Sequence, residues 1–563
     1  MSTGPLGFLR KEHIVAPDGY NRWRVPPASI AIHLCIGSVY AWSVFNPALT
    51  RELGVVTSAA GDWSLSSVVW IFSVAIVVLG LTAAVGGKWL EAVGPRYVGV
   101  VAAALWGGGF GVGALGIATH QLWLIYLGYG VLGGAGLGLG YVSPVSTLIR
   151  WFPDRRGMAT GMAIMGFGGG AMIGAPLKQW LLERFQTVPT YLGAVTDLSL
   201  RTEGGRRFVD TEQGSVEVVL ATAEQAATFG GEAGAYVVGT GDTGASMTFL
   251  TLGAIYFCVM TLAAFQYRVP RVGWAPEGWT PKPVASGMVT QNNVHIDQAI
   301  KTPPFWLLWL VLCFNVTAGI GVIGVAKTMI DEIFGELAIV TAAFAGTYVL
   351  MISVFNMGGR FFWATISDII GRKNTYHCFF VLGTILYCTI PFWAASGGTS
   401  ALVGFYISTM VIFTMYGGGF ATIPAYLADI FGTMHVGGIH GRLLTAWSTA
   451  GVLGPLAITT LRDRSMADAI ASLAVQVDPA AFAQAFGAPV SQLPELVAAR
   501  TVTIAGLMEI APPGTVDPSS TLYDSTMFAM AGLLVVAFFA NLMVRPVSAA
   551  HHVEQTHGDD ARG

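Results

Sequence analysis

Charge is scarce in this sequence. Asp, Glu, Lys and Arg make up 11% of the 563 residues, where soluble domains have about 25%. Apolar residues other than glycine supply 53%, and 72 glycines add to that share. Basic and acidic residues nearly balance, with 29 against 32, and no basic stripe occurs. The composition excludes intrinsic disorder and a collagen-like fibre, and it predicts a membrane protein with no nucleic-acid partner.

Cysteine is also scarce, and catalytic motifs are missing. The cysteines lie inside apolar runs, so we interpret them as buried small hydrophobic residues that form neither disulfides nor a metal site. They are Cys35, Cys258, Cys313, Cys378 and Cys388. No zinc-protease, serine-hydrolase, CxxC or nucleotide-loop motif occurs in a usable context. The sequence therefore predicts no cofactor, no metal and no enzymatic activity. No cleaved leader is expected, because the N-terminal segment lacks an apolar stretch before a cleavage site.

Long apolar runs dominate instead. Windows of about 20 apolar residues can cross a hydrocarbon core of roughly 30 Å. Twelve such helices are predicted, at 28–49, 64–86, 97–117, 122–149, 157–183, 246–267, 304–330, 340–364, 374–396, 400–428, 438–461 and 526–545. Basic residues gather in alternate short loops, which contain Lys88 and Arg96, then Arg150, Arg155 and Arg156, then Arg372 and Lys373. The positive-inside rule therefore predicts that both termini are cytoplasmic.

The two halves of the chain repeat. The segment GKWLEAVGPR, beginning at Gly87, aligns with ATISDIIGRK, beginning at Ala364, at an offset of 277 residues. Two parallel halves with a site between them describe one class of secondary transporter. We expect an all-α integral membrane fold of twelve helices in two parallel six-helix repeats. The expected divisions are a cytoplasmic N-terminal segment 1–27, a first half 28–267, a cytoplasmic linker 268–303, a second half 304–545 and a cytoplasmic tail 546–563.

Polar insertions interrupt both halves before their last helix, at about 184–245 and 462–525. Both are rich in Ala, Gly and Thr, with scattered acidic residues. The repeat places both outside the cell. We predict two small, partly ordered elements that pack on each other as a cap; the alternative is two unrelated flexible loops.

One short loop occurs in two copies, and its charges suit a gate. The copies carry an acid, a glycine and a basic residue at matching positions: Asp368, Gly371 and Lys373 in one, where Arg372 precedes the lysine, and Glu91, Gly94 and Arg96 in the other. Glycine permits a tight turn, and the acid can meet a helix N-terminus or a neighbouring arginine in a contact that breaks as the halves rock. These loops resemble the signature loop of the major facilitator superfamily, which implies the major facilitator fold.

Arg360 is the cation expected deepest in the membrane. It precedes Asp368 by eight residues, about 12 Å along a helix, and no Asp or Glu occurs at comparable depth in a predicted helix. Such a guanidinium suits a bidentate carboxylate ligand; the alternative is bonding to backbone carbonyls and water at a helix crossing. Asn356, one turn earlier, is expected to support it. Lys178 and Arg442 lie near predicted helix ends and are expected to snorkel to the interface.

Aromatic residues in five helices form a second candidate set. They are Tyr40, Trp42, Tyr141, Phe167, Tyr416 and Trp447. Packing accounts for each one singly, but together around one arginine they would form a small, dry box for a short carboxylate. His33, inside the first helix, is either a proton relay or a hydrogen-bonded structural histidine. Glycine-rich runs such as GFGGGAMIGAP, ending at Pro176, are interpreted as close helix packing.

Five segments carry a closer resemblance: GSVYAWSVFNPAL, RWFPDRRGMATGM, TPPFWLLWLVLCFNVTAGIG, GGRFFWATISDIIGRK and HGRLLTAWSTAGVLGP. Together they resemble the oxalate:formate antiporter family of the major facilitator superfamily, over both halves and the linker but neither insertion. The resemblance implies transport of small carboxylates by alternating access, with Arg360 at the family's helix 8 arginine. It also implies an aromatic cage that falls on Tyr40, Tyr141, Phe167 and Tyr416, although Phe167 lacks the hydroxyl expected there.

One departure from the family bears on the substrate. Oxalate carriers have a second cation in a Thr-Ala-Lys stretch, where this chain has Trp447. A single fixed charge favours a monocarboxylate such as formate, lactate or pyruvate. The alternatives are an oxalate:formate exchanger, with Arg442 reaching inward as the second charge, and, more remotely, an anion-sensing transceptor. The lack of a carboxylate in the pathway favours exchange or uniport over proton symport, with His33 as the reservation.

The expected setting follows from these features. We predict a multi-pass plasma-membrane protein, of a prokaryotic inner membrane, whose partners are a small organic anion and the lipid bilayer. A monomer is compatible with the sequence, which leaves the oligomeric state open.

Overall fold

The computed structural model describes residues 7–203, 206–212, 214–221, 226, 230–279, 288–290, 292–486, 489–498, 502 and 504–553. The chain forms two compact units. The first unit comprises Met1–Lys301, Leu427–Ser448 and Pro546–Gly563, and the second comprises Thr302–Tyr426 and Thr449–Arg545. Over the described residues, 12 helices are long and apolar enough to cross a membrane, which confirms the number predicted.

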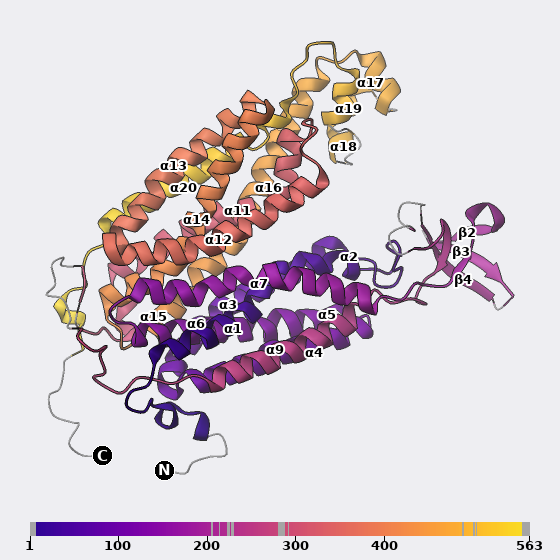
Figure 1. The fold of residues 1–563 in the computed structure, drawn as a ribbon. Coiled ribbons are helices and arrows are strands. Elements are labelled where there is room, and N and C mark those ends of the chain that lie inside the picture. The colour runs from indigo at the N-terminus through magenta and orange to yellow at the C-terminus, as the bar shows by residue number, and fades with distance from the viewer. Residues whose placement is uncertain are drawn as a thin grey trace. The chain divides into compact units, whose positions relative to one another are not determined.

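The first unit is built on long helices in sequential hairpins. Its main helices are α1 (Val25–Gly37), α3 (Leu65–Val93), α4 (Pro95–Ala118), α6 (Gly134–Trp151), α7 (Arg156–Phe185), α9 (Ala245–Phe265) and α15 (Val436–Leu443). The pairs α4 with α9, α1 with α7, and α3 with α6 and α15 pack side by side (Figure 1). Local signals set the ends: the Ser64 hydroxyl accepts from Ser67 N at the start of α3, and α4 begins at Pro95.

Two helices that the sequence predicted as continuous are divided. The first continues from α1 into the 3₁₀ segment η4 (Ser38–Phe45) and then α2 (Asn46–Leu49), with non-helical dihedrals at Ala41. The fourth begins as α5 (Leu122–Ile125) and passes through a π-helical segment, η5 (Tyr126–Gly133), before α6. Such departures from the α-helix redirect backbone carbonyls and often mark functional positions. The expectation of unbroken helices was therefore wrong at both places.

Glycines on α7 allow its backbone to approach α1. A Cβ placed on Gly170 would lie 2.5 Å from the carbonyl carbon of Gly37, and one on Gly37 would lie 2.2 Å from the Phe167 carbonyl oxygen. No side chain fits at either distance. The interpretation of these glycine runs as close helix packing is confirmed.

The first insertion forms an antiparallel sheet of five strands in the order β1-β5-β4-β3-β2. The strands are β1 (Tyr191–Gly193), β2 (Leu200–Glu203), β3 (Arg206–Thr211), β4 (Gly214–Ala221) and β5 (Gly234–Val237). Alternate residues of β4 enter different clusters: Val218 packs with Val209 and Ala235, whereas Val219 packs with Val56 and Tyr236. This alternation is the period of a strand with apolar residues on both faces.

The second unit holds α11 (Pro303–Phe334), α12 (Ala342–Ile370), α13 (Arg372–Ser396), α14 (Gly398–Phe431, its last turn in the first unit), α16 (Thr445–Ala474, after its first turn) and α20 (Asp524–Met543). Helix α20 packs against α11 and α13 (Figure 1). The second insertion contains the end of α16 and the short helices α17 (Pro479–Phe486), α18 (Leu493–Ala498) and α19 (Ile504–Ile510).

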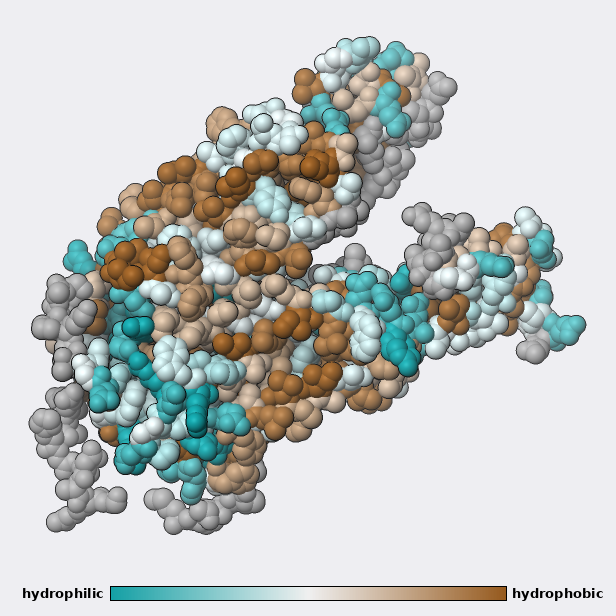
Figure 2. All heavy atoms as spheres, viewed as in Figure 1, coloured by the Kyte–Doolittle hydropathy of each residue, from teal (hydrophilic) through white to brown (hydrophobic). Residues whose placement is uncertain are grey.

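The helical surfaces are apolar. Large side chains such as Val85, Leu262 and Phe392 are more than half exposed, and Figure 2 shows brown, apolar side chains over the helices and more teal over the sheet. Such surfaces suit lipid contact. The expectation of buried cysteines holds for Cys35 and Cys313, whereas Cys388 is half-buried. It was wrong for Cys258 and Cys378, which are exposed, because apolar helices present one face outward; all five cysteines are free.

Candidate functional site

Arg360 is a buried cation of the second unit. Its side chain is fully buried on α12. Its Nε donates to Asn356 Oδ1 at 3.1 Å, and its guanidinium carbon lies 5.4 Å from the centre of the Phe420 ring. The support expected from Asn356 is present, because residues four apart share one helix face. An amide and a ring orient the guanidinium without neutralising its charge.

Tyr416 lies on α14, in the same unit as Arg360. Its ring centre is 5.5 Å from that of Phe420, which in turn contacts the guanidinium. Helices α12 and α14 touch closely here, since a Cβ on Gly417 would lie 2.1 Å from the Asn356 carbonyl oxygen. Arg360, Asn356 and Tyr416 therefore belong to one packed neighbourhood in the second unit.

Four of the other five predicted aromatic residues come together in the first unit. Ring centres are 5.1 Å apart for Tyr40 and Phe167, and 5.4 Å apart for Tyr141 and Phe167, Tyr141 and Trp447, and Phe167 and Trp447. We call these four residues the aromatic cluster. Trp42 is not part of it, because its ring packs on Tyr129 at 4.4 Å. Segments more than 400 residues apart in the chain thus supply one apolar neighbourhood.

Two buried histidines border the aromatic cluster. His33 Nδ1 lies 2.5 Å from the Ala163 carbonyl oxygen, and its Nε2 lies 3.3 Å from that of Tyr141. His440 was missed from the sequence, although it is buried with its ring centre 5.8 Å from that of Tyr141. His440 precedes Trp447 by seven residues, a spacing that places two residues on one face of a helix. This spacing was the signal in the sequence that could have placed His440 beside the predicted aromatic residues. His33 is held by backbone carbonyls, as the structural alternative expects.

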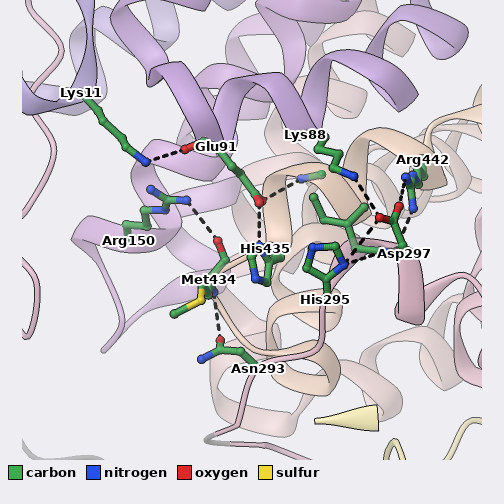
Figure 3. Close-up of polar contacts among 12 residues, drawn as sticks. Lys11, Lys88, Glu91, Arg150, Asn293, His295, Asp297, Met434, His435 and Arg442 are labelled. Carbon is green, nitrogen blue, oxygen red and sulfur yellow. Dashed lines mark hydrogen bonds and ion pairs between the residues drawn. The ribbon is translucent and has the colours of Figure 1, made fainter. Parts of the chain in front are cut away.

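The two copies of the gating loop share their turn. Gly94 has φ of 95° and Gly371 has φ of 86°, values that side-chain-bearing residues rarely adopt. The acid of the first copy reaches α15: Glu91 Oε1 accepts from Gly438 N at 3.1 Å, and Oε2 lies 2.8 Å from His435 Nδ1 (Figure 3). Glu91 thus meets a helix N-terminus, where a negative charge is favoured.

The acid of the second copy contacts an arginine of its own loop. Asp368 Oδ1 accepts from Arg372 at 2.5 Å, across one helical turn. The basic residues of the two copies bind matching places. Arg96 donates to the Phe265 and Tyr267 carbonyl oxygens, at 3.0 and 3.2 Å, just beyond α9. Lys373 donates to the Leu542 and Val544 carbonyl oxygens, at 2.9 and 2.8 Å, at the end of α20.

Arg442 does not reach inward as a second substrate charge. It pairs with Asp297 at 2.6 Å and donates to the Ile296 carbonyl oxygen at 2.9 Å, next to α10 (Ile296–Ala299). Lys88 pairs with the same carboxylate at 2.9 Å (Figure 3). Hydrogen bonds from Arg442 and Lys88 lower the pKa of Asp297 to about 2. The alternative in which Arg442 reaches inward is therefore wrong, because a carboxylate lies within its reach in the linker.

Lys178 also contradicts its prediction. Its side chain is fully buried, and its Nζ donates to the Ser38 carbonyl oxygen at 2.7 Å rather than reaching an interface. Distance along the chain to a helix end suggested snorkelling. The face of α7 that carries Lys178 packs against η4, however, and this packing directs the side chain inward.

Comparisons with known proteins indicate the class of protein to which the chain is similar. The sequence pattern of the Major Facilitator Superfamily matches residues 29–196. The fold is similar to that of the fucose:proton symporter FucP of E. coli, with a TM-score of 0.53 at 13% identity, over 92% of this chain and 99% of that one. The chain is thus similar to transporters of the major facilitator superfamily, in sequence over residues 29–196 and in fold over most of its length.

Three known relatives are similar to the chain over most of its length. It is 25% identical to the oxalate:formate antiporter of Oxalobacter formigenes over 77% of this chain and 83% of that relative. It is 23% identical to the MFS-type transporter YhjX of Escherichia coli (strain K12), over 78% and 88%. Apicoplast pyruvate carrier 1 of Toxoplasma gondii is 22% identical, over 73% and 78%.

Proposed function

We propose that this protein carries small carboxylates across the plasma membrane by alternating access, with a monocarboxylate such as formate, lactate or pyruvate as the favoured substrate. The observation that supports this most is the buried guanidinium of Arg360, held by Asn356 and the Phe420 ring. A guanidinium stays protonated and presents a planar fork that matches a carboxylate. The relatives described above include an oxalate:formate antiporter and a pyruvate carrier, and oxalate, formate and pyruvate are all carboxylates.

The charges favour a monoanion. Trp447 occupies the position where the family's oxalate carriers have a lysine, and it lies inside the aromatic cluster. Arg442, the other candidate for a second charge, is paired with Asp297. A dianion would therefore meet one permanent positive charge, and its second carboxylate would be poorly compensated.

Uptake into proteoliposomes tests the proposal. Vesicles loaded with formate, lactate or oxalate should take up the labelled monocarboxylates, and Arg360→Gln should lower this uptake at least about 30-fold, because truncating one partner of a buried charged pair costs about 2–5 kcal/mol. Arg360→Lys keeps the charge without the fork and should retain partial activity. The absence of uptake for every acid, with Arg360→Gln folded, would refute the carboxylate assignment.

The alternative is an oxalate:formate exchanger, which similarity to the Oxalobacter formigenes relative favours. Trp447→Lys would supply the family's second cation and should raise dicarboxylate affinity by about tenfold if one added ion pair contributes about 1.4 kcal/mol. An unchanged affinity, or an equal fall for all substrates, would contradict the charge argument. An anion-sensing transceptor would bind carboxylates in the same vesicles without moving them.

A further inference from the structure

Lys178 is a buried cation that the proposed substrate site does not use. It lies on α7 with no exposed surface. Its ammonium donates to the Ser38 carbonyl oxygen at 2.7 Å and lies 4.8 Å from the centre of the Phe45 ring. Both partners are neutral and belong to η4, where the first helix leaves the α-helical path. The ammonium thus binds a carbonyl that the 3₁₀ geometry redirects.

Among the residues that the structure describes, none supplies a carboxylate partner to the Lys178 ammonium. Helices α1, α6 and α9 and segment η4 pack against α7, and none of them contains Asp or Glu. Their titratable side chains are His33 and Cys35 on α1, Tyr40 on η4, Tyr141 and Arg150 on α6, and Tyr256 and Cys258 on α9. Helix α7 itself carries Arg156, Glu183 and Arg184 near its ends, and Glu183 is exposed.

A buried ammonium without a carboxylate has two routes to stability. Placing a lysine charge within the membrane costs about 2.5–3.5 kcal/mol on insertion scales, so the group either loses its proton or gains an anion nearby. Arginine cannot take the first route, because its guanidinium stays protonated. Lysine can, since its amine is readily deprotonated when buried. Lys178 is therefore suited to alternate between charged and neutral forms during a transport cycle.

Lys178 is connected to the aromatic cluster through two rigid elements. Phe167 and Lys178 lie eleven residues apart on α7, which is about three turns and returns to the same helix face. Tyr40 lies on η4, between the Ser38 and Phe45 partners of the ammonium, and its ring contacts Phe167. A proton gained or lost at Lys178 changes how η4 is held, and η4 carries Tyr40. These contacts connect the Lys178 ammonium to the aromatic cluster through η4 and α7.

We propose that Lys178 is the proton-coupling group of this carrier, so that the protein is a proton–carboxylate symporter. The inference rests on the carboxylate function proposed above. One proton binds the Lys178 amine when one carboxylate anion binds, and both leave on the other side. The loaded and empty carriers then have the same net charge, so neither form meets an extra electrostatic cost when it changes between its outward- and inward-facing states. The expectation of exchange or uniport considered carboxylates and His33 as proton carriers, but not a buried lysine.

Proteoliposomes containing the full chain test this assignment with labelled formate and lactate. For the wild type, an inward gradient of about one pH unit should drive about tenfold accumulation of substrate. One pH unit is about a tenfold ratio of proton concentrations, which balances about a tenfold ratio of substrate concentrations when one proton moves with one anion. A pH-sensitive dye should show proton entry together with substrate. Lys178→Arg keeps the charge but cannot release the proton, so it should still exchange labelled for unlabelled substrate while accumulation falls to about onefold.

Matched variants separate coupling from structure. Lys178→Gln should also lose gradient-driven accumulation, whereas Lys178→His should restore it with a pH profile displaced to more acidic values, because histidine titrates lower than lysine. Lys301→Gln, which changes an exposed lysine between the helices, should behave as the wild type. Full accumulation by Lys178→Arg or Lys178→Gln would overturn the assignment.

The two proposals fail differently. A wild type that moves no carboxylate at all contradicts the carboxylate function. A wild type that exchanges carboxylates without proton entry leaves that function intact and overturns the role of Lys178, even if no Lys178 variant folds.

Discussion

The two copies of the gating loop share a backbone turn and differ in what their acids bind. In both, the basic residue binds carbonyl oxygens at the end of the last helix of its own repeat: Arg96 after α9 and Lys373 after α20. The acids diverge, because Glu91 binds the start of α15 whereas Asp368 pairs with Arg372 in its own loop. The basic contact is thus the shared structural part of the motif, and the acid is the part free to acquire a gating role.

The glycines offer the largest test of this comparison. A Cβ on Gly94 would lie 2.7 Å from the Lys11 Cβ, whereas one on Gly371 would meet nothing within 4 Å. Both substitutions to Ala should incur about 1–3 kcal/mol of backbone strain, and Gly94→Ala should be the more destabilising because of the added clash. Thermal unfolding in detergent measures the difference. Equal falls in Tm for the two variants would show that the N-terminal segment around Lys11 moves aside at no measurable cost.

The basic residues should give the next largest effect. Arg96→Ala removes hydrogen bonds from a buried guanidinium and should cost about 2–3 kcal/mol, near the upper range for charged donors. Lys373→Ala should cost about half as much, because its ammonium is partly exposed and water replaces the lost partners. Denaturant unfolding of both variants tests this, with Arg96→Lys as the control that retains a donor. A larger loss for Lys373→Ala would reverse the comparison.

The acids should affect transport more than stability. Glu91→Gln retains an oxygen for Gly438 N but loses its charge toward His435, and it should change initial uptake by about threefold, as expected for a pair worth about 0.6–1 kcal/mol. Asp368→Asn weakens the pair with Arg372 and should stay near the wild-type rate. Equal effects of the two variants on uptake would show that the contact with α15 has no special part in the cycle.

The smallest effect concerns Asp297. Its pKa is lowered to about 2 by Arg442 and Lys88, so the stabilising contribution of the carboxylate is present above its unfolded-state pKa and is lost only as the pH falls through about 2. Asp297→Asn should therefore leave the shape of the uptake profile between pH 5 and 8 unchanged. A displaced profile would show that the Arg442 pair contributes to pH dependence.

Local sequence rules succeeded where one helix face carries the whole interaction. The spacing of four residues predicted the contact between Arg360 and Asn356, and paired glycines predicted the close approach of α7 to α1. The same rules failed for Lys178, whose environment depends on η4 rather than on its distance from a helix end. They also missed His440, since its burial depends on Tyr141 about 300 residues earlier.

Hydropathy and periodicity along the chain were sufficient for the twelve spans, the turn glycines and the buried arginine, because each depends on residues within one or two helical turns. The breaks in the first and fourth helices, the sheet in the first insertion, the pairing of Arg442 with Asp297 and the burial of Lys178 required the packed structure. These features depend on which distant backbone carbonyls, rings and carboxylates lie within reach of a side chain, and packing between helices determines that distance.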